Sequence, residues 1–218
     1  MKIYYLAVIL ITFIVPKALF GQGESPVGLN IDSLEHALNF EVHSPSEKIE
    51  TLNILSELYM LSDLSKALDY NYRSLSLIDE GTDTELYANT LMISGGILKS
   101  RGQLNESLSK LFQALKMIEG TDNYPLIAKN MRLIGETYRA FAEYEQAMAF
   151  LQKAKKVAKQ NAKGELAYIY NRIAATKYEL LDFNQVIKYA DSAIMYAPNG
   201  AGPNFMASCY TITGAAEK

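Results

Sequence analysis

The chain has 218 residues, of which 49% are hydrophobic and 21% are charged, so it has enough apolar surface to build amphipathic helices. Its formal net charge of −3 argues against nucleic-acid binding, which requires a basic surface. The single cysteine, Cys209, excludes an internal disulfide, and its apolar neighbours predict that it acts as a small buried hydrophobe.

Residues 1–21 have the pattern of a secretory signal peptide. Lys2 precedes an apolar run, 3–15, and the small residues Gly21 and Gly23 follow. The run is too short to cross a hydrocarbon layer of about 30 Å comfortably. We therefore predict export to the periplasm or another extracytoplasmic space, with cleavage after Gly21. The alternative is that the segment stays as an N-terminal anchor.

Residues 22–44 are predicted to form an N-terminal segment with one short capping helix. Asp32 can cap this helix, and its apolar residues share one face: Leu34, Ala37 and Leu38. The motif Ser44-Pro45-Ser46-Glu47 then combines an N-cap, a proline in the first turn and a capping-box glutamate. A longer helix is expected to begin at Pro45.

From Pro45 onward, a two-helix pattern recurs and clusters of turn-forming residues separate the units. Asp79-Glu80-Gly81-Thr82-Asp83 closes the first unit, and Glu119-Gly120-Thr121-Asp122-Asn123 closes the second. The predicted units span residues 45–80, 84–120, 124–160 and 164–198, with a partial unit at 202–218. Because that last unit lacks a second helix, we expect a fragment of a longer protein.

Small residues hold a fixed period in both helices of the units. The first-helix column is Gly95, Gly135, Ala174 and Gly214, spaced by 40, 39 and 40 residues. The second-helix column is Ala67, Ser107, Ala147 and Val186, spaced by 40, 40 and 39. Two independent columns with one period indicate a repeat. Small residues let helix backbones approach closely, so each unit is predicted to be an antiparallel helix hairpin.

These residues resemble the tetratricopeptide repeat. The resemblance is carried by Ile134-Gly135-x-x-Tyr138, Tyr144-x-x-Ala147 and Leu151-x-x-Ala154, and it extends over residues 45–218. It implies an all-α fold, a right-handed solenoid of antiparallel helix pairs, which in that family binds peptides or proteins. The period of about 40 residues exceeds the usual 34 of that repeat. The leader, which ends in Phe-Gly-Gln, resembles those of exported Bacteroidetes envelope or signalling proteins.

Residues that carry chemistry are sparse. The two histidines, His36 and His43, both precede the first full unit and lie far from Cys209 in the sequence, so a zinc site is not expected. Gly95-Gly96 falls within a predicted helix and serves packing, not phosphate binding. We therefore expect a protein that is not an enzyme and that needs no cofactor and no metal.

The resemblance implies that the first helix of each unit lines a concave groove. The residues that lie off the Gly135–Tyr138 packing stripe, and so are free to face that groove, are Asn89, Met92 and Lys99 in the second unit, Lys129, Arg132, Glu136 and Arg139 in the third, and Tyr168, Asn171 and Tyr178 in the fourth. Three cations would meet there, flanked by two tyrosines, and could hold the carboxylates of an acidic or C-terminal peptide. The alternative is a solvated face whose charge Glu136 partly balances.

The first functional hypothesis is an exported, non-catalytic scaffold that binds a protein or peptide, in one version as the sensory part of a longer signalling protein. The alternative is an outer-membrane-associated nutrient or glycan-uptake component. In either case we expect no nucleic-acid partner, and contact with a membrane only through the leader or through a region beyond Lys218.

Overall fold

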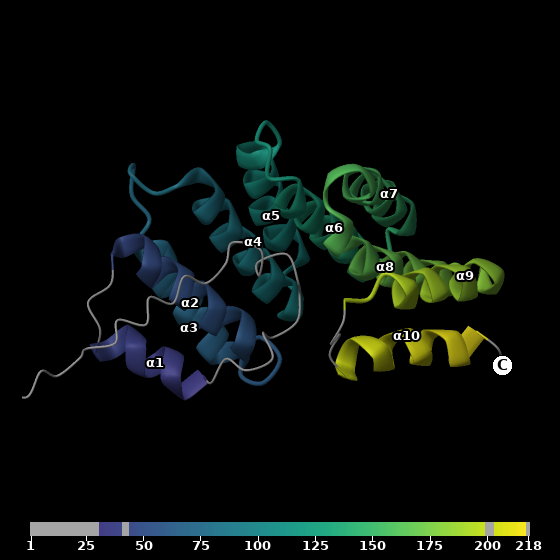
Figure 1. Ribbon diagram of the computed structural model, residues 1–218, viewed down its shortest axis with the longest axis horizontal. Coiled ribbons are helices and arrows are strands. Elements are labelled where there is room, and N and C mark those ends of the chain that lie inside the picture. The colour runs from purple at the N-terminus through teal and green to yellow at the C-terminus, as the bar shows by residue number, and fades with distance from the viewer. Residues whose placement is uncertain (1–30, 41–43, 199–202, 217–218) are drawn as a thin grey trace, which may run out of the picture.

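A computed structural model describes residues 31–40, 44–198 and 203–216, and within these ranges all regular structure is helical. The elements are α1 (Ile31–Phe40), α2 (Pro45–Tyr59), α3 (Leu64–Ser76), α4 (Thr84–Ser100), α5 (Leu104–Ile118), α6 (Tyr124–Ala140), α7 (Tyr144–Asn161), the 3-10 helix η2 (Lys163–Glu165), α8 (Leu166–Glu179), α9 (Phe183–Met195) and α10 (Pro203–Ala216). They stack as successive antiparallel pairs along an arc from α1 to α10 (Figure 1). The predicted all-α solenoid is confirmed.

Side-chain caps determine where several helices begin. At the start of α2 the Ser44 hydroxyl accepts a hydrogen bond from the Glu47 N–H, and the Ser44 N–H donates to Glu47 Oε2 at 2.8 Å. This is the predicted capping box, and Pro45 is the first helical residue. The carboxylates of Asp63 and Asp83 accept backbone N–H groups at the starts of α3 and α4. These bonds satisfy donors that a helix N-terminus would otherwise leave unpaired.

The glycine column allows close helix crossings in two of the pairs. A Cβ atom at Gly135 would lie 2.8 Å from Leu151 Cγ and 3.1 Å from the Ala147 carbonyl oxygen, and one at Gly95 would lie 2.7 Å from Leu111 Cγ. The two distances to the leucine side chains are shorter than real Cβ contacts, and the distance to the carbonyl oxygen is tighter than most of them. At Gly214 the same atom would meet nothing within 4 Å. The predicted close packing is therefore present in α4·α5 and α6·α7, whereas Gly214 in α10 faces open space.

Ser107 occupies a position where the repeat pattern has alanine. The close helix crossing explains the serine, because it brings a backbone acceptor within reach of the hydroxyl. Its hydroxyl donates to the Gly95 carbonyl oxygen at 2.8 Å. In the first unit, Ser56 Oγ likewise donates to the Ala67 carbonyl oxygen at 2.8 Å. A small hydroxyl thus joins the two helices of a unit where their backbones approach most closely.

The turns inside the second, third and fourth units share one backbone conformation. Gly102, Ala142 and Leu181 have φ angles of 76°, 60° and 58°, in the left-handed region. They are 40 and 39 residues apart, so they occupy the same position of successive units. These three turns therefore use a left-handed residue, and only the second unit supplies the glycine that favours it. Ser62, at the same position of the first unit, does not have a positive φ.

The arc curves toward the first helices. α2 contacts α4, α4 contacts α6, α6 contacts α8 and α8 contacts α10, whereas neighbouring second helices barely touch. Neighbouring units approach most closely on the inner side of a curve, so the first helices line that side, as the resemblance implies. We call this side the inner face.

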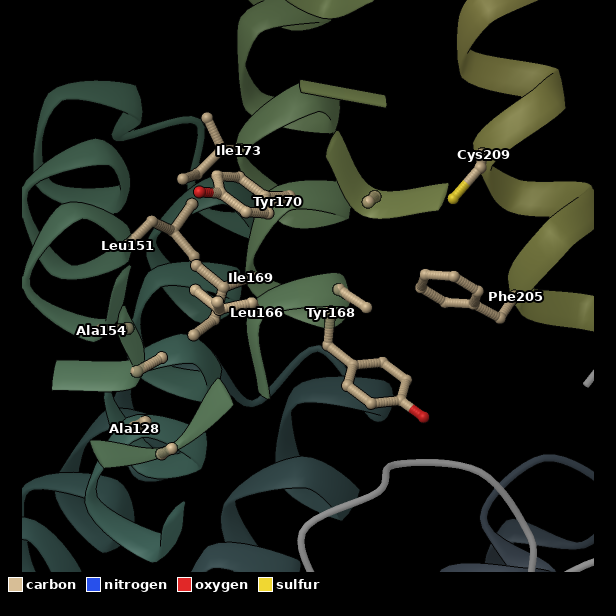
Figure 2. Close-up of a cluster of buried hydrophobic side chains, with 14 residues drawn as sticks. Ala128, Leu151, Ala154, Leu166, Tyr168, Ile169, Tyr170, Ile173, Phe205 and Cys209 are labelled. Carbon is tan, nitrogen blue, oxygen red and sulfur yellow. The ribbon is translucent and has the colours of Figure 1, made fainter. Parts of the chain in front are cut away.

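Buried apolar side chains form three clusters among the described residues, and each cluster joins consecutive units. The part around α8 draws on α6, α7, α9 and α10, and in Figure 2 Phe205 and Cys209 point from α10 toward α8. The rings of Tyr168 and Phe205 meet edge to face, with centroids 5.3 Å apart. Cys209 is fully buried in this core, as predicted for a small hydrophobe.

The first unit is closed by α1, which packs on α2. Glu35 of α1 accepts hydrogen bonds from the hydroxyls of Tyr59 and Tyr70, at 2.8 and 2.7 Å. Burial and the bond to Glu35 raise the pKa of Tyr70 to about 12. The predicted leader (1–21) and His43 lie outside the described residues. None of the helices within the described ranges is both long and apolar enough to span a membrane.

Candidate functional site

The ten residues predicted to line the groove fall into two groups. Seven are buried: Asn89, Met92, Lys129, Arg132, Glu136, Tyr168 and Asn171. The other three, Lys99, Arg139 and Tyr178, are partly exposed and occupy equivalent positions near the C-terminal ends of α4, α6 and α8. We call these three the exposed row. The side chains accessible to a partner are thus fewer than the sequence predicts, and they line one end of the inner face.

Glu136 lies at the centre of the inner face and pairs with three cations from three helices. Its carboxylate accepts hydrogen bonds from Lys99 Nζ at 2.6 Å and from an Arg132 terminal nitrogen at 2.7 Å, and its Oε1 lies 3.1 Å from Arg172 Nε. Burial by itself raises the pKa of Glu136, but the charges of Lys99, Arg172 and Arg132 outweigh that effect and hold the pKa well below its ordinary value of 4.5. Glu136 is therefore ionised at neutral pH and ties α4, α6 and α8 together.

Arg132 extends this network to a second buried carboxylate. Arg132 Nε lies 3.4 Å from Glu165 Oε2, and the guanidinium carbon lies 5.6 Å from the centroid of the Tyr168 ring. Burial raises the pKa of Glu165, and the nearby charges of Arg132 and Lys129 only partly offset this. Glu165 Oε1 is buried without a hydrogen-bond partner. We call Lys99, Arg132, Glu136, Glu165 and Arg172 the ion-pair network.

Lys129 is paired outside this network. Its Nζ donates to Glu57 Oε1 at 2.9 Å, although Glu57 lies in α2, two units away. The Lys129 side chain is 8% exposed and the Glu57 side chain is 40% exposed. Lys129 is thus a buried cation whose carboxylate partner is partly exposed to solvent.

The remaining predicted residues have structural contacts or lie in the floor of the face. The Asn171 amide nitrogen lies 3.3 Å from Ser208 Oγ and 3.2 Å from Cys209 Sγ, so it joins α8 to α10. Met92 is almost fully buried in α4. The side-chain oxygen of Asn89 is buried without a hydrogen-bond partner.

The exposed row carries two cations and one aromatic ring. Lys99 is 25% exposed and Arg139 31%, and Arg139 lies 3.5 Å from Glu179 of α8. Tyr178 is 36% exposed and packs edge to face against Phe183 at 5.9 Å. Such a row can form charge-assisted hydrogen bonds and provide an apolar contact to a chain lying across the first helices.

Sequence reasoning missed three members of the charged arrangement: Glu57, Glu165 and Arg172. The signal that could have found them is the spacing between facing residues of adjacent first helices. Lys99 and Glu136 are 37 residues apart, and Glu136 and Arg172 are 36 apart. Lys129 and Glu57 differ by 72, which is two such steps. This spacing is about one helical turn shorter than the period of about 40 residues.

No three His, Cys, Asp or Glu side chains within the described ranges are placed to hold a metal ion. His36 lies exposed on α1. The charged groups that do gather on the inner face form ion pairs of opposite sign. These pairs link neighbouring helices.

The family model of the tetratricopeptide repeat matches residues 86–160, the span from α4 to α7. Within this span the chain contains tetratricopeptide repeats. The matched repeats are the second and third units, which hold the close crossings at Gly95 and Gly135 and most of the ion-pair network.

Solved structures with the same fold include BtubC from P. vanneervenii, with a TM-score of 0.65 and 14% identity over 85% of this chain and 78% of that one. Aspartyl phosphate phosphatase F from Bacillus subtilis has a TM-score of 0.69 and 18% identity over 86% of this chain and 51% of its own length. A Rap protein complexed with Competence and Sporulation Factor has a TM-score of 0.58 and 18% identity over 86% of this chain and 59% of that one. The chain thus spans only half to three fifths of the last two proteins. No curated protein matches the sequence.

Proposed function

We propose that the chain is a non-catalytic scaffold that binds a protein or peptide across its inner face. The observation that carries this proposal is the exposed row, in which Lys99, Arg139 and Tyr178 occupy equivalent, partly exposed positions on three adjacent first helices. The buried ion pairs beneath the row supply a rigid floor. A Rap protein of the same fold has been solved with Competence and Sporulation Factor bound, which supports a ligand-binding role for such an array.

The chemistry of the row favours a ligand with carboxylate groups. Two of its three members are cations, and the ring of Tyr178 offers an apolar surface beside them. We propose that an acidic segment or a C-terminal carboxylate binds here in an extended conformation.

Fluorescence anisotropy with two labelled six-residue peptides tests this proposal. One peptide is rich in Asp and Glu with a free C-terminus, and the other is its amidated Asn and Gln analogue. Arg139→Gln combined with Tyr178→Ala should weaken binding of the acidic peptide about tenfold, a change of about 1.4 kcal/mol.

The matched control changes the same two residue types on the outer helix α3. Tyr72 is 73% exposed and the neighbouring Arg73 side chain 44% exposed. Tyr72→Ala combined with Arg73→Gln should leave binding unchanged. Equal loss in both double variants, or no preference for the acidic peptide in the wild type, would reject the inner face as the site.

We also propose that the protein is exported, because the leader pattern at residues 1–21 precedes the helical array. Mass spectrometry of the mature protein should place its first residue near Gln22 or Glu24. A soluble cytoplasmic product that retains Met1 would contradict export.

The array is further proposed to act as the sensory part of a longer signalling protein. A genomic reading frame that continues past Lys218 into a membrane span would support this version. A stop codon within a few residues would reject it.

A further inference from the structure

The pair between Lys129 and Glu57 differs from every other contact of the buried cations on the inner face. Lys129 Nζ and Glu57 Oε1 are 2.9 Å apart, and the pair reaches from α6 to α2. The Lys129 side chain is 8% exposed, whereas Glu57 is 40% exposed. Arg132, the other fully buried cation, is held by Glu136 and Glu165, whose side chains are 9% and 1% exposed.

This difference decides which carboxylate a ligand can replace. Displacing Glu136 or Glu165 would leave a charged group in the interior, where an unpaired charge is strongly unfavourable. Glu57 can instead rotate into solvent and be hydrated there. A buried ammonium must keep an anionic partner, so Lys129 can release Glu57 only when another anion takes its place.

The charge count of the inner face agrees with an exchange. Apart from the pair of Arg139 with Glu179, which is balanced in itself, the cations in contact with its carboxylates are Lys99, Lys129, Arg132 and Arg172, and the carboxylates are Glu57, Glu136 and Glu165. Four positive groups thus face three negative ones, and without Glu57 they would face two. One carboxylate from a ligand restores the balance that the free protein has.

We propose that Glu57 occupies the position of a ligand carboxylate at Lys129, and that a carboxylate of the bound peptide displaces it. This inference rests on the proposed function and adds to it a second anchoring point and an internal competitor. Glu57 lowers the affinity for acidic ligands. Only a ligand whose carboxylate binds Lys129 better than the Glu57 carboxylate does can displace it.

The position of Lys129 also sets the length of the ligand. Lys129 and Arg139 are ten residues apart on α6, which corresponds to about 15 Å along the helix. An extended chain covers that distance in about five residues. A peptide of this length can place a carboxylate at Lys129 while its other end contacts the exposed row.

The test uses the same anisotropy assay on the full chain with three single variants. Glu57→Gln removes the internal competitor, Lys129→Met removes the ammonium and keeps an apolar stem of similar length, and Glu80→Gln removes an equal charge from an exposed turn. Circular dichroism verifies that each variant keeps its helical content.

Glu57→Gln should tighten binding of the acidic peptide about fivefold to tenfold and leave the amidated Asn and Gln analogue unaffected. Glu80→Gln should change neither. Lys129→Met should weaken acidic-peptide binding, and adding Glu57→Gln to it should bring no gain, because the two residues act on one site. An amidated acidic peptide and a neutral peptide with a free C-terminus show whether the displacing carboxylate comes from a side chain or from the chain end.

If Glu57→Gln binds the acidic peptide no more tightly than the wild type, the exchange is rejected. This holds even if Lys129→Met shows that Lys129 contributes to binding. In that case the proposed function survives if the exposed-row variants still lose affinity. If no variant binds any of the four peptides, both proposals fail.

Discussion

Substituting Gly135 by alanine isolates the energy of the close helix crossing. The added Cβ would lie 2.8 Å from Leu151 Cγ and 3.1 Å from the backbone oxygen of Ala147. Leu151 is fully buried and cannot move aside, and the backbone of α7 is held by its own hydrogen bonds. Overpacking of this kind costs about 1 to 3 kcal/mol. Alanine also favours a helix over glycine by about 1 kcal/mol, which partly hides that cost.

Gly214→Ala provides the matched control, because Gly214 occupies the same repeat position within α10 and its Cβ would meet nothing within 4 Å. This variant should gain only the helix propensity and be more stable by up to about 1 kcal/mol. The difference between the two variants therefore measures packing alone and should be about 1 to 3 kcal/mol.

Urea unfolding followed by far-ultraviolet circular dichroism measures both variants. In thermal unfolding, each kcal/mol should appear as a shift of about 2 to 4 °C for a chain of this size. Gly135→Leu should destabilise the third unit further, since it inserts a larger side chain at the same contact. If Gly135→Ala proves as stable as Gly214→Ala, the close crossing does not exist in solution.

Three further substitutions probe the charged interior and the turns. Glu136→Gln should destabilise the protein by about 3 to 5 kcal/mol in urea unfolding, because it leaves buried cations uncompensated; a loss below about 1 kcal/mol would contradict the arrangement. The folded-state pKa of Glu136 is well below 4.5, so the stability that its charge provides is present above pH 4.5 and is lost as the pH falls toward that lower value. The difference in stability between wild type and Glu136→Gln should accordingly shrink in acid, and a constant difference would argue against it. Gly102→Ala should cost about 1 kcal/mol at its left-handed φ of 76°. Leu181→Gly should stabilise by a similar amount, since the leucine is 71% exposed and little burial is lost. A stabilising Gly102→Ala together with a destabilising Leu181→Gly would reject the role of this turn.

Much of the fold could be predicted because its signals are local and repeat. Ser44 and Glu47 lie three residues apart and form the capping box without any tertiary contact. The glycine column recurs with one period, so two close crossings could be inferred from a single pattern. The resemblance to the tetratricopeptide repeat rested on the same residues, and the family match over 86–160 confirms it.

The candidate site was predicted less completely. The sequence placed Lys99, Arg132 and Glu136 on the inner side of their helices, but it did not reveal that Arg132 would be buried between two carboxylates. Helical periodicity assigns a side chain to a face, whereas its exposure depends on how closely the next helix approaches.

By itself, the sequence determined the helix hairpins and their order, because capping, periodicity and small-residue spacing act within one helix or one pair. Only the tertiary structure decided which charges meet. Glu57 and Lys129 are 72 residues apart, and they pair because α2, α4 and α6 pack against one another in succession, which no pattern within one helix encodes. This packing between units separates the buried residues of the inner face from the row that stays partly exposed.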